Sequence, residues 1–166
     1  MERIKGRVRK FGDNIDTDTI TAAPTLHLPI EEMKRHAFEP IKPDFSETVE
    51  QGDIIVAGHN FGCGSSREQA TDVVRELGIR YIVCESMARI YFRNCIALGL
   101  YPIMAKGVSS IFNEGDEIEI DLKQGELRNP KTSESTPFKP LVGTTRELVE
   151  GGGILPVLKR IIEKDQ

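Results

Sequence analysis

The chain has few cysteines and none of the spacings by which cysteines hold metals. Its three cysteines, Cys63, Cys84 and Cys95, lie far apart, and no Cys-x-x-Cys pair occurs. The sequence therefore offers no zinc or iron–sulfur motif of its own. We expect reduced and mostly buried thiols at Cys84 and Cys95. Cys63 is expected to be more exposed, but the absence of an evident general base beside it disfavours a nucleophilic role.

Long apolar runs and blocks of like charge are also missing. No stretch approaches the roughly 20 residues that a membrane helix needs, and the first five residues lack the apolar core of a signal peptide. The formal net charge is −4 and no basic block stands out, which disfavours a nucleic-acid or anionic-membrane partner. The cytoplasm is therefore the expected location.

The order of the expected elements indicates an α/β fold within one domain, residues 1–166. Strands and helices are expected to alternate in the order 53–58, 66–77, 79–84, 86–98 and 100–104. This alternation implies right-handed crossovers and a parallel sheet, with Gly78 and Gly99 as helix caps. The flanking expectations are a strand at 2–11, a helix at 30–38, a hairpin at 115–128, an irregular stretch at 129–143, a helix at 146–150 capped by Thr144 or Thr145, and a helix at 154–164.

The stretch Gly58–Gln69, which reads Gly-His-Asn-Phe-Gly-Cys-Gly-Ser-Ser-Arg-Glu-Gln, is the most informative part of the chain. Its glycines permit tight turns and close approach of a ligand to the backbone. A helix is expected to start at Ser65, with Ser65 and Glu68 forming a capping box. The first-turn N–H groups and Arg67 would then face an anion. The pattern predicts an anion site centred on Ser65, at the carboxyl end of a parallel strand.

Other known loop chemistries do not fit this spacing. A P-loop needs a lysine after its last glycine, and a dinucleotide-binding loop needs a small residue where this chain has Arg67. The Gly-x-Ser-x-Gly elbow of hydrolases is absent. A serine hydrolase that uses His59 stays open, although no orienting acid is evident.

Several blocks of the chain, taken in order, resemble one family. Gly58–Ala70 is similar to the signature of the small subunits of 3-isopropylmalate dehydratase and homoaconitase, a module that also resembles the C-terminal swivelling domain of aconitase. The other blocks that resemble this family are Phe11–Ile20, Ser86–Asn94 with Gly99–Ile103, and Gly151–Ile154. The resemblance covers nearly the whole chain. It implies a single swivelling β/β/α-type domain with a partly parallel sheet flanked by helices.

The resemblance also implies a reaction and a partner. Members dehydrate and rehydrate hydroxy-di- or tricarboxylic acids, and the isopropylmalate enzymes serve leucine biosynthesis. Their [4Fe-4S] cluster lies on a separate large subunit, so this chain alone would be inactive. By similarity, Ser65 would be the catalytic base that removes the proton α to a carboxylate. Arg67 would bind a substrate carboxylate, with Gly64 and Ser66 supplying nearby donors.

The loop 24–28 aligns with the family's specificity loop and leaves the substrate open. Its variable position is often small and apolar for an isopropyl group, or arginine for an extra carboxylate. Here it is His27, which is polar but shorter than arginine, and Thr25 and Leu28 depart from the usual tyrosine and threonine. The candidate substrates are isopropylmalate, homoaconitate or homocitrate, and a branched malate such as 2,3-dimethylmalate. A solvent-facing loop histidine is the alternative.

The remaining polar residues receive structural interpretations. Asp13, Asp16 and Asp18 are expected to form side-chain-to-backbone turns at a subunit interface rather than a cation site. Arg89 and Arg93 are expected to face acidic residues or the large subunit, and His36 is expected at the surface. A non-catalytic anion-binding module that kept the fold is the competing hypothesis. The intact Ser65-Ser66-Arg67 run argues against it.

Overall fold

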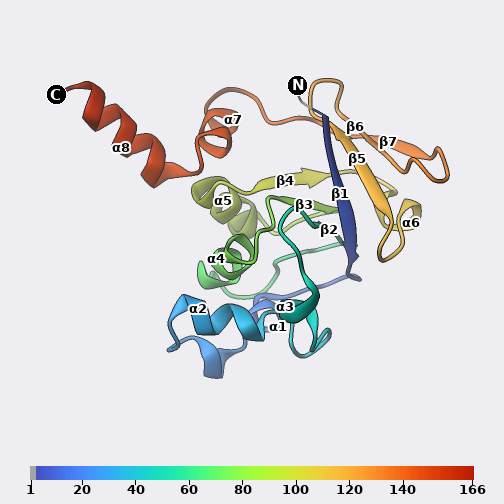
Figure 1. Cartoon of the computed structure of the whole chain (residues 1–166), viewed down its shortest axis with the longest axis horizontal. Helices are drawn as coiled ribbons and strands as arrows, with labels where there is room; N and C mark the ends of the chain where they lie inside the picture. The colour runs from blue at the N-terminus through green and yellow to red at the C-terminus, as the bar shows by residue number, and fades with distance from the viewer. Residues whose placement is uncertain (1–2) are drawn as a thin grey trace.

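The sheet is built around the first strand of the chain. The structure is a computed structural model that describes residues 3–166. The strand predicted at 2–11 is β1 (Arg3–Lys10), and residue 2 of that prediction lies outside the described part. Within the described residues the sheet has seven strands in the order β4-β3-β2-β1-β5-β6-β7, so β1 is central (Figure 1).

Parallel and antiparallel pairing meet at β1. On one side the strands run parallel to it: β2 (Ile54–Val56), β3 (Tyr81–Cys84) and β4 (Tyr101–Met104). On the other side each strand is antiparallel to its neighbour: β5 (Glu117–Asp121), β6 (Glu126–Arg128) and β7 (Ser135–Pro137). This arrangement confirms the α/β class with a partly parallel sheet. The predicted hairpin 115–128 is β5–β6. The stretch 129–143 was expected to be irregular throughout, and this is wrong because it contains β7.

Helices connect and cover these strands. The α-helices are α1 (Thr17–Ile20), α2 (Ile30–Met33), α3 (Phe45–Thr48), α4 (Gln69–Glu76), α5 (Arg89–Leu98), α6 (Val108–Ile111), α7 (Gly143–Glu150) and α8 (Ile154–Lys164). Two 3-10 turns accompany them, η1 (Ala23–Thr25) and η2 (Lys34–His36). The helix predicted at 30–38 is therefore split into α2 and η2. The predicted caps Gly78 and Gly99 adopt positive φ angles of 89° and 81°.

The strand β2 is buried on both faces, as its unbroken apolar sequence predicts. Ile55 packs in a core with residues of α1, α3 and α4, and this core includes three phenylalanine rings with centroids 4.4 to 5.4 Å apart. Ile54 and Val56 pack in a second core with α6, α7 and β5. The end of β2 is thus held rigidly, and the loop that follows it starts from a fixed position.

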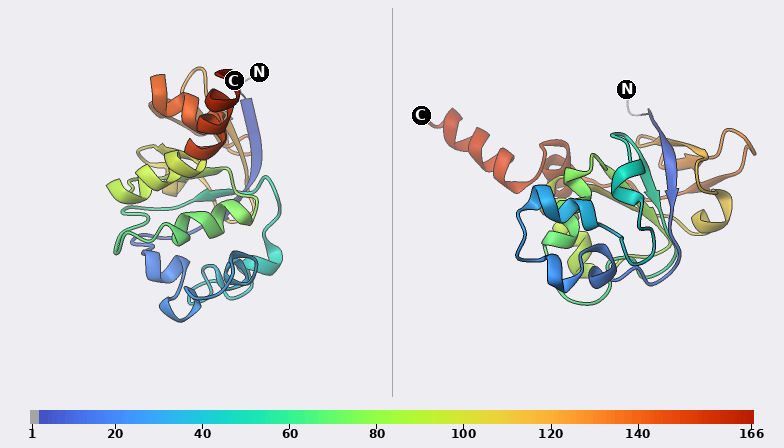
Figure 2. Two further views of the ribbon diagram at one scale, coloured as in Figure 1. Left: turned by 90° about the vertical axis from the view of Figure 1, so that its left-hand side faces the viewer. Right: turned by 60° about the horizontal axis from the view of Figure 1, so that its bottom comes forward.

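The first of the two C-terminal helices begins at Gly143, three residues before the predicted start at 146. The helix α7 has Val142 as its N-cap without a side-chain capping bond, so the predicted cap at Thr144 or Thr145 is wrong. The helix α8 spans the predicted 154–164 and extends away from the body of the molecule (Figure 2). Leu155, Leu158 and Ile162 lie on it with 78%, 49% and 58% of their surface exposed. No helix within residues 3–166 has the length and apolar character to cross a membrane.

Candidate active site

The loop 58–68 leaves the carboxyl end of β2 and lies against the segment 13–21. The backbone N–H of Gly62 donates to the Ile15 carbonyl at 2.7 Å, and the N–H of Thr17 donates to the Cys63 carbonyl at 2.9 Å. A parallel bridge also joins Asp16 to Cys63. Two segments far apart in the sequence therefore form one continuous turn surface at the strand ends, where the sequence predicted the site.

Side chains of the segment 13–21 complete this pairing. Asp13 Oδ1 accepts from the N–H of His59 at 2.7 Å, and Asn60 Nδ2 donates to Asn14 Oδ1 at 3.2 Å. Asp16 accepts from the N–H of Thr19 at 2.7 Å and so caps α1. The expected side-chain-to-backbone turn is confirmed at Asp16. Asp13 instead bonds to the backbone of the distant loop, and Asp18 pairs with Arg67. Their expected place at a subunit interface stays a prediction.

The helix after the loop begins later than predicted. The helix α4 starts at Gln69, and its N-cap residue Glu68 makes no side-chain capping bond. The capping box of Ser65 with Glu68 is therefore wrong. The N–H groups of Ala70 and Thr71 already donate to loop carbonyls, so they are not directed at an anion beside Ser65.

The late start of α4 has a physical cause in the loop itself. Gly64 has a φ of +104°, which side chains rarely adopt, and the N–H of Arg67 closes a tight turn onto the Ser65 carbonyl at 2.9 Å. The Arg67 side chain then bonds to the carbonyl of Thr21. These contacts hold the loop against α1 and outweigh the local capping preference of the serine.

Ser65 is exposed, and its hydroxyl faces a second hydroxyl. Its Oγ lies 3.2 Å from Thr17 Oγ1, and either atom can donate. Gly64 makes this approach feasible, because a Cβ there would lie 3.1 Å from Thr17 Oγ1. Gly64 and Ser66 are also exposed, which leaves their polar groups accessible to a ligand.

Arg67 is fixed by two acceptors on the neighbouring turn. Its Nη1 forms an ion pair with Asp18 Oδ1 and donates to the Thr21 carbonyl at 3.1 Å. The side chain is 22% exposed, so the guanidinium remains accessible from one side. Sequence analysis predicted Arg67 but missed both of its partners. The only available signal was the alternation of acids and threonines at 16–19.

His27 and His59 lie outside this arrangement. His27 is exposed in the turn after η1, and no described contact joins it to Ser65 or Arg67. His59 Nδ1 lies 3.6 Å from Asp13, and among the described hydrogen bonds none links His59 to Ser65. The hydrolase alternative therefore gains no support. His36 pairs with Glu39 at the surface, as predicted.

The two inner cysteines are buried in surroundings that disfavour the thiolate. Burial, followed by the charge of Glu85, raises the pKa of Cys84 to about 12, and burial raises that of Cys95 well above its usual value. Both are fully buried, as predicted, while Cys63 is partly exposed. Within the described chain, no three His, Cys, Asp or Glu residues come together in a group suited to a metal ion.

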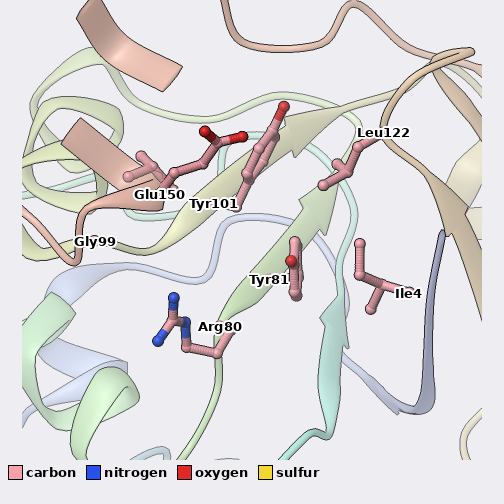
Figure 3. Close-up of a pocket in the computed structure, with 8 residues that line it drawn as sticks. Ile4, Arg80, Tyr81, Gly99, Tyr101, Leu122 and Glu150 are labelled. Carbon is pink, nitrogen blue, oxygen red and sulfur yellow. The ribbon is translucent and has the colours of Figure 1, made fainter. Parts of the chain in front are cut away.

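Two hollows lie away from Ser65. One, of about 300 Å³, opens at the amino ends of β3 and β4, which is the opposite end of the parallel strands from the loop 58–68. Arg80, Tyr81 and Glu150 are among the residues that line it (Figure 3). The other, of about 400 Å³, is lined by Met87, Arg89, Phe92, Arg93 and Met104. Both arginines are exposed, so their predicted role toward a partner stays a prediction. None of the predicted catalytic or substrate-binding residues lines either hollow.

The fold agrees with the comparisons with known proteins. Residues 3–107 match the family described as Aconitase C-terminal domain, a span that includes β1 to β4 and the whole site. The chain belongs to the aconitase C-terminal domain family. This family implies an iron–sulfur cluster, for which the described residues of this chain provide no ligand group.

Three named relatives indicate which kind of family member this chain is. The isopropylmalate/citramalate isomerase small subunit of Methanocaldococcus jannaschii is 45% identical over 164 residues, which are 98% of each chain. The methanogen homoaconitase small subunit of Methanothermobacter thermautotrophicus is 44% identical over 153 residues, 92% of this chain and 88% of that one. The crystal structure of 3-isopropylmalate dehydratase (leuD) from Methanocaldococcus jannaschii has a TM-score of 0.90 at 39% identity, covering 99% of each chain. The chain is a small subunit of an aconitase-type hydro-lyase.

Proposed function

We propose that residues 1–166 form one swivelling domain that completes the active site of a two-chain hydro-lyase of the 3-isopropylmalate dehydratase type. The large subunit supplies the [4Fe-4S] cluster, since residues 3–166 offer no ligand group for it. The proposal rests on two residues that lie on one turn surface: Ser65, whose hydroxyl is exposed, and Arg67, whose side chain is anchored to the neighbouring turn. The cytoplasm is the location that fits this role.

In this proposal Ser65 acts as the base. The proton α to a substrate carboxylate moves to Ser65 Oγ, and the reverse transfer returns it during rehydration. A serine hydroxyl is a weak acid, so its deprotonated form needs donors and positive charge in a site closed to water. Arg67 binds the carboxylate, and Gly64 and Ser66 add donors around it. The large subunit closes the exposed face over the substrate.

The substrate class is a small 2-hydroxy di- or tricarboxylate. Relatives of similar identity are named for isopropylmalate and citramalate or for homoaconitase, so the leading substrate is 3-isopropylmalate. Homoaconitate, homocitrate and 2,3-dimethylmalate are the alternatives. His27, in its exposed turn, is the residue proposed to contact the variable group of the substrate.

The test is Ser65→Ala in the complex reconstituted with its large subunit and cluster. Because the general base is lost, turnover of 3-isopropylmalate should fall on the order of 10²–10⁴-fold, while gel filtration shows an intact complex. Ser110→Ala, an exposed serine away from the loop, is the matched control and should keep full activity. Near-normal turnover of Ser65→Ala would refute the base assignment. An inactive wild-type complex would favour the non-catalytic anion-binding module.

A further inference from the structure

The short helix α1 touches both residues that the proposed function needs. Thr17 lies against Ser65 through the paired hydroxyls, and Asp18 lies against Arg67 through the ion pair. These two are consecutive residues of one turn, and neither has been assigned a part in the reaction. Their placement suggests that α1 fixes the geometry of the base and of the carboxylate-binding arginine together.

Thr17 is held so that only its hydroxyl can act on Ser65. The residue is 2% exposed, its N–H is bonded to the Cys63 carbonyl, and its own carbonyl accepts from Thr21 through both the N–H and Oγ1. Among the described contacts, its Oγ1 has Ser65 Oγ as its single partner. A hydroxyl fixed in this way can donate to Ser65 Oγ when the serine loses its proton, which stabilises the charged form.

Asp18 and the Thr21 carbonyl both bind the same nitrogen of Arg67. The two described contacts of the guanidinium go to Nη1, which leaves the edge formed by Nε and Nη2 without a partner in the described part of the chain. That edge presents two parallel N–H groups, the arrangement that binds a carboxylate in a bidentate manner. Asp18 therefore orients the arginine without occupying its carboxylate-binding edge.

We propose that Thr17 and Asp18 are positioning residues of the hydro-lyase site, Thr17 for the Ser65 hydroxyl and Asp18 for the Nε–Nη2 edge of Arg67. The inference rests on the proposed function, because it assigns these residues to the same base and the same carboxylate contact. The inference also predicts that the two residues affect different steps. Thr17 acts on proton transfer, whereas Asp18 acts on the binding of a substrate carboxylate.

The test separates the two effects by steady-state kinetics of the reconstituted complex. Thr17→Val keeps the shape and removes the hydroxyl, so kcat should fall roughly tenfold or more with KM nearly unchanged. Thr17→Ser should restore kcat. Asp18→Asn should raise KM roughly tenfold with a smaller change in kcat. Asp44→Asn, an exposed carboxylate without a side-chain capping bond, is the control. Thermal unfolding verifies that each variant is folded.

A binding measurement keeps the inference separate from the proposed function. Titration of the complex with the unreactive dicarboxylate succinate should show weaker binding for Asp18→Asn and unchanged binding for Ser65→Ala. If Ser65→Ala abolishes turnover but Thr17→Val and Asp18→Asn behave as the wild type, the inference is overturned and the proposed function stands. If the wild-type complex has no turnover, the proposed function and the part assigned to Thr17 fail. Succinate binding then decides the part assigned to Asp18.

Discussion

At the scale of single residues, the site depends on close approaches that only certain side chains permit. Gly62 has a φ of +77°, and a Cβ there would lie 2.2 Å from the ring of Tyr91. Tyr91 is itself fixed, since its buried hydroxyl donates to the Ala70 carbonyl at 2.9 Å. The loop therefore rests directly on α5, and its distance from the core is set by the absence of one side chain.

The residue that we expect to control substrate preference is His27. Arginine at this exposed position would extend farther and carry a permanent charge, so His27→Arg should raise kcat/KM for homoaconitate relative to 3-isopropylmalate by roughly tenfold, about 1.4 kcal/mol. A panel of the candidate hydroxy acids, assayed with wild type and variant, measures this ratio. An unchanged substrate preference across the panel would contradict the proposed role of His27 in specificity.

At the scale of elements, β1 is attached to its surroundings by an ion-pair network. Asp53, 4% exposed, accepts from Arg7 Nε at 3.0 Å and from Arg7 Nη2 at 2.6 Å, and it lies 3.5 Å from Arg9 Nη1. Arg9 also bonds to Glu114 at 3.0 Å. The network joins β1 to the turn before β2 and to the turn before β5. It therefore links the parallel and antiparallel halves of the sheet.

This network should make stability depend on pH. Burial alone would raise the pKa of Asp53, but the Arg7 hydrogen bonds, the N–H of Glu50 and the arginine charges hold it below its usual value. Because the folded-state pKa is depressed, the stabilisation is complete above the unfolded pKa of about 3.9 and is lost as pH falls through the lower folded-state pKa. Urea unfolding between neutral and strongly acidic pH should show this loss.

Asp53→Asn tests the origin of that dependence. It should lower the free energy of unfolding at pH 7 by about 1–3 kcal/mol, since it leaves Arg9 buried with one partner fewer. The variant should also flatten the acid limb of the pH profile. Asp44→Asn, an exposed carboxylate, should do neither. An acid limb that persists unchanged in Asp53→Asn would assign it to other carboxylates.

At the scale of the whole molecule, the chain forms its own cores, whereas the site that we propose needs a second subunit to complete it. Both cores are closed, and the site surface is open to solvent at Gly64, Ser65 and Ser66. The isolated chain should therefore unfold cooperatively yet show no hydratase activity and no visible absorption of an iron–sulfur cluster after anaerobic treatment with iron and sulfide. Both signals should appear only when the large subunit is added. Cluster absorption from the isolated chain would contradict the division of labour proposed for the two subunits.

The sequence predicted those parts of the molecule that local pattern determines. Ile54–Val56 and Tyr81–Cys84 are apolar throughout because both faces are covered, which is readable without a structure. The strand β7 was missed because only its middle residue is buried, so it shows little alternation. The start of α4 was misplaced because Ser65 and Arg67 bond to α1, and contacts between such distant segments leave no local periodic signal.

The central place of β1 in the sheet has a consequence for how the chain folds. The strand β1 is synthesised before the two strands that pair with it. One of its edges can pair only after β2 is made, and the other only after β5, residues 117–121, is made. All strands of the parallel half, and every loop of the site, are synthesised before β5. The parallel half can thus assemble on the ribosome while one edge of β1 stays unpaired, and pairing that edge with β5 is a late, long-range step. Slow translation before β5 would prolong the interval in which the nascent chain is prone to aggregate.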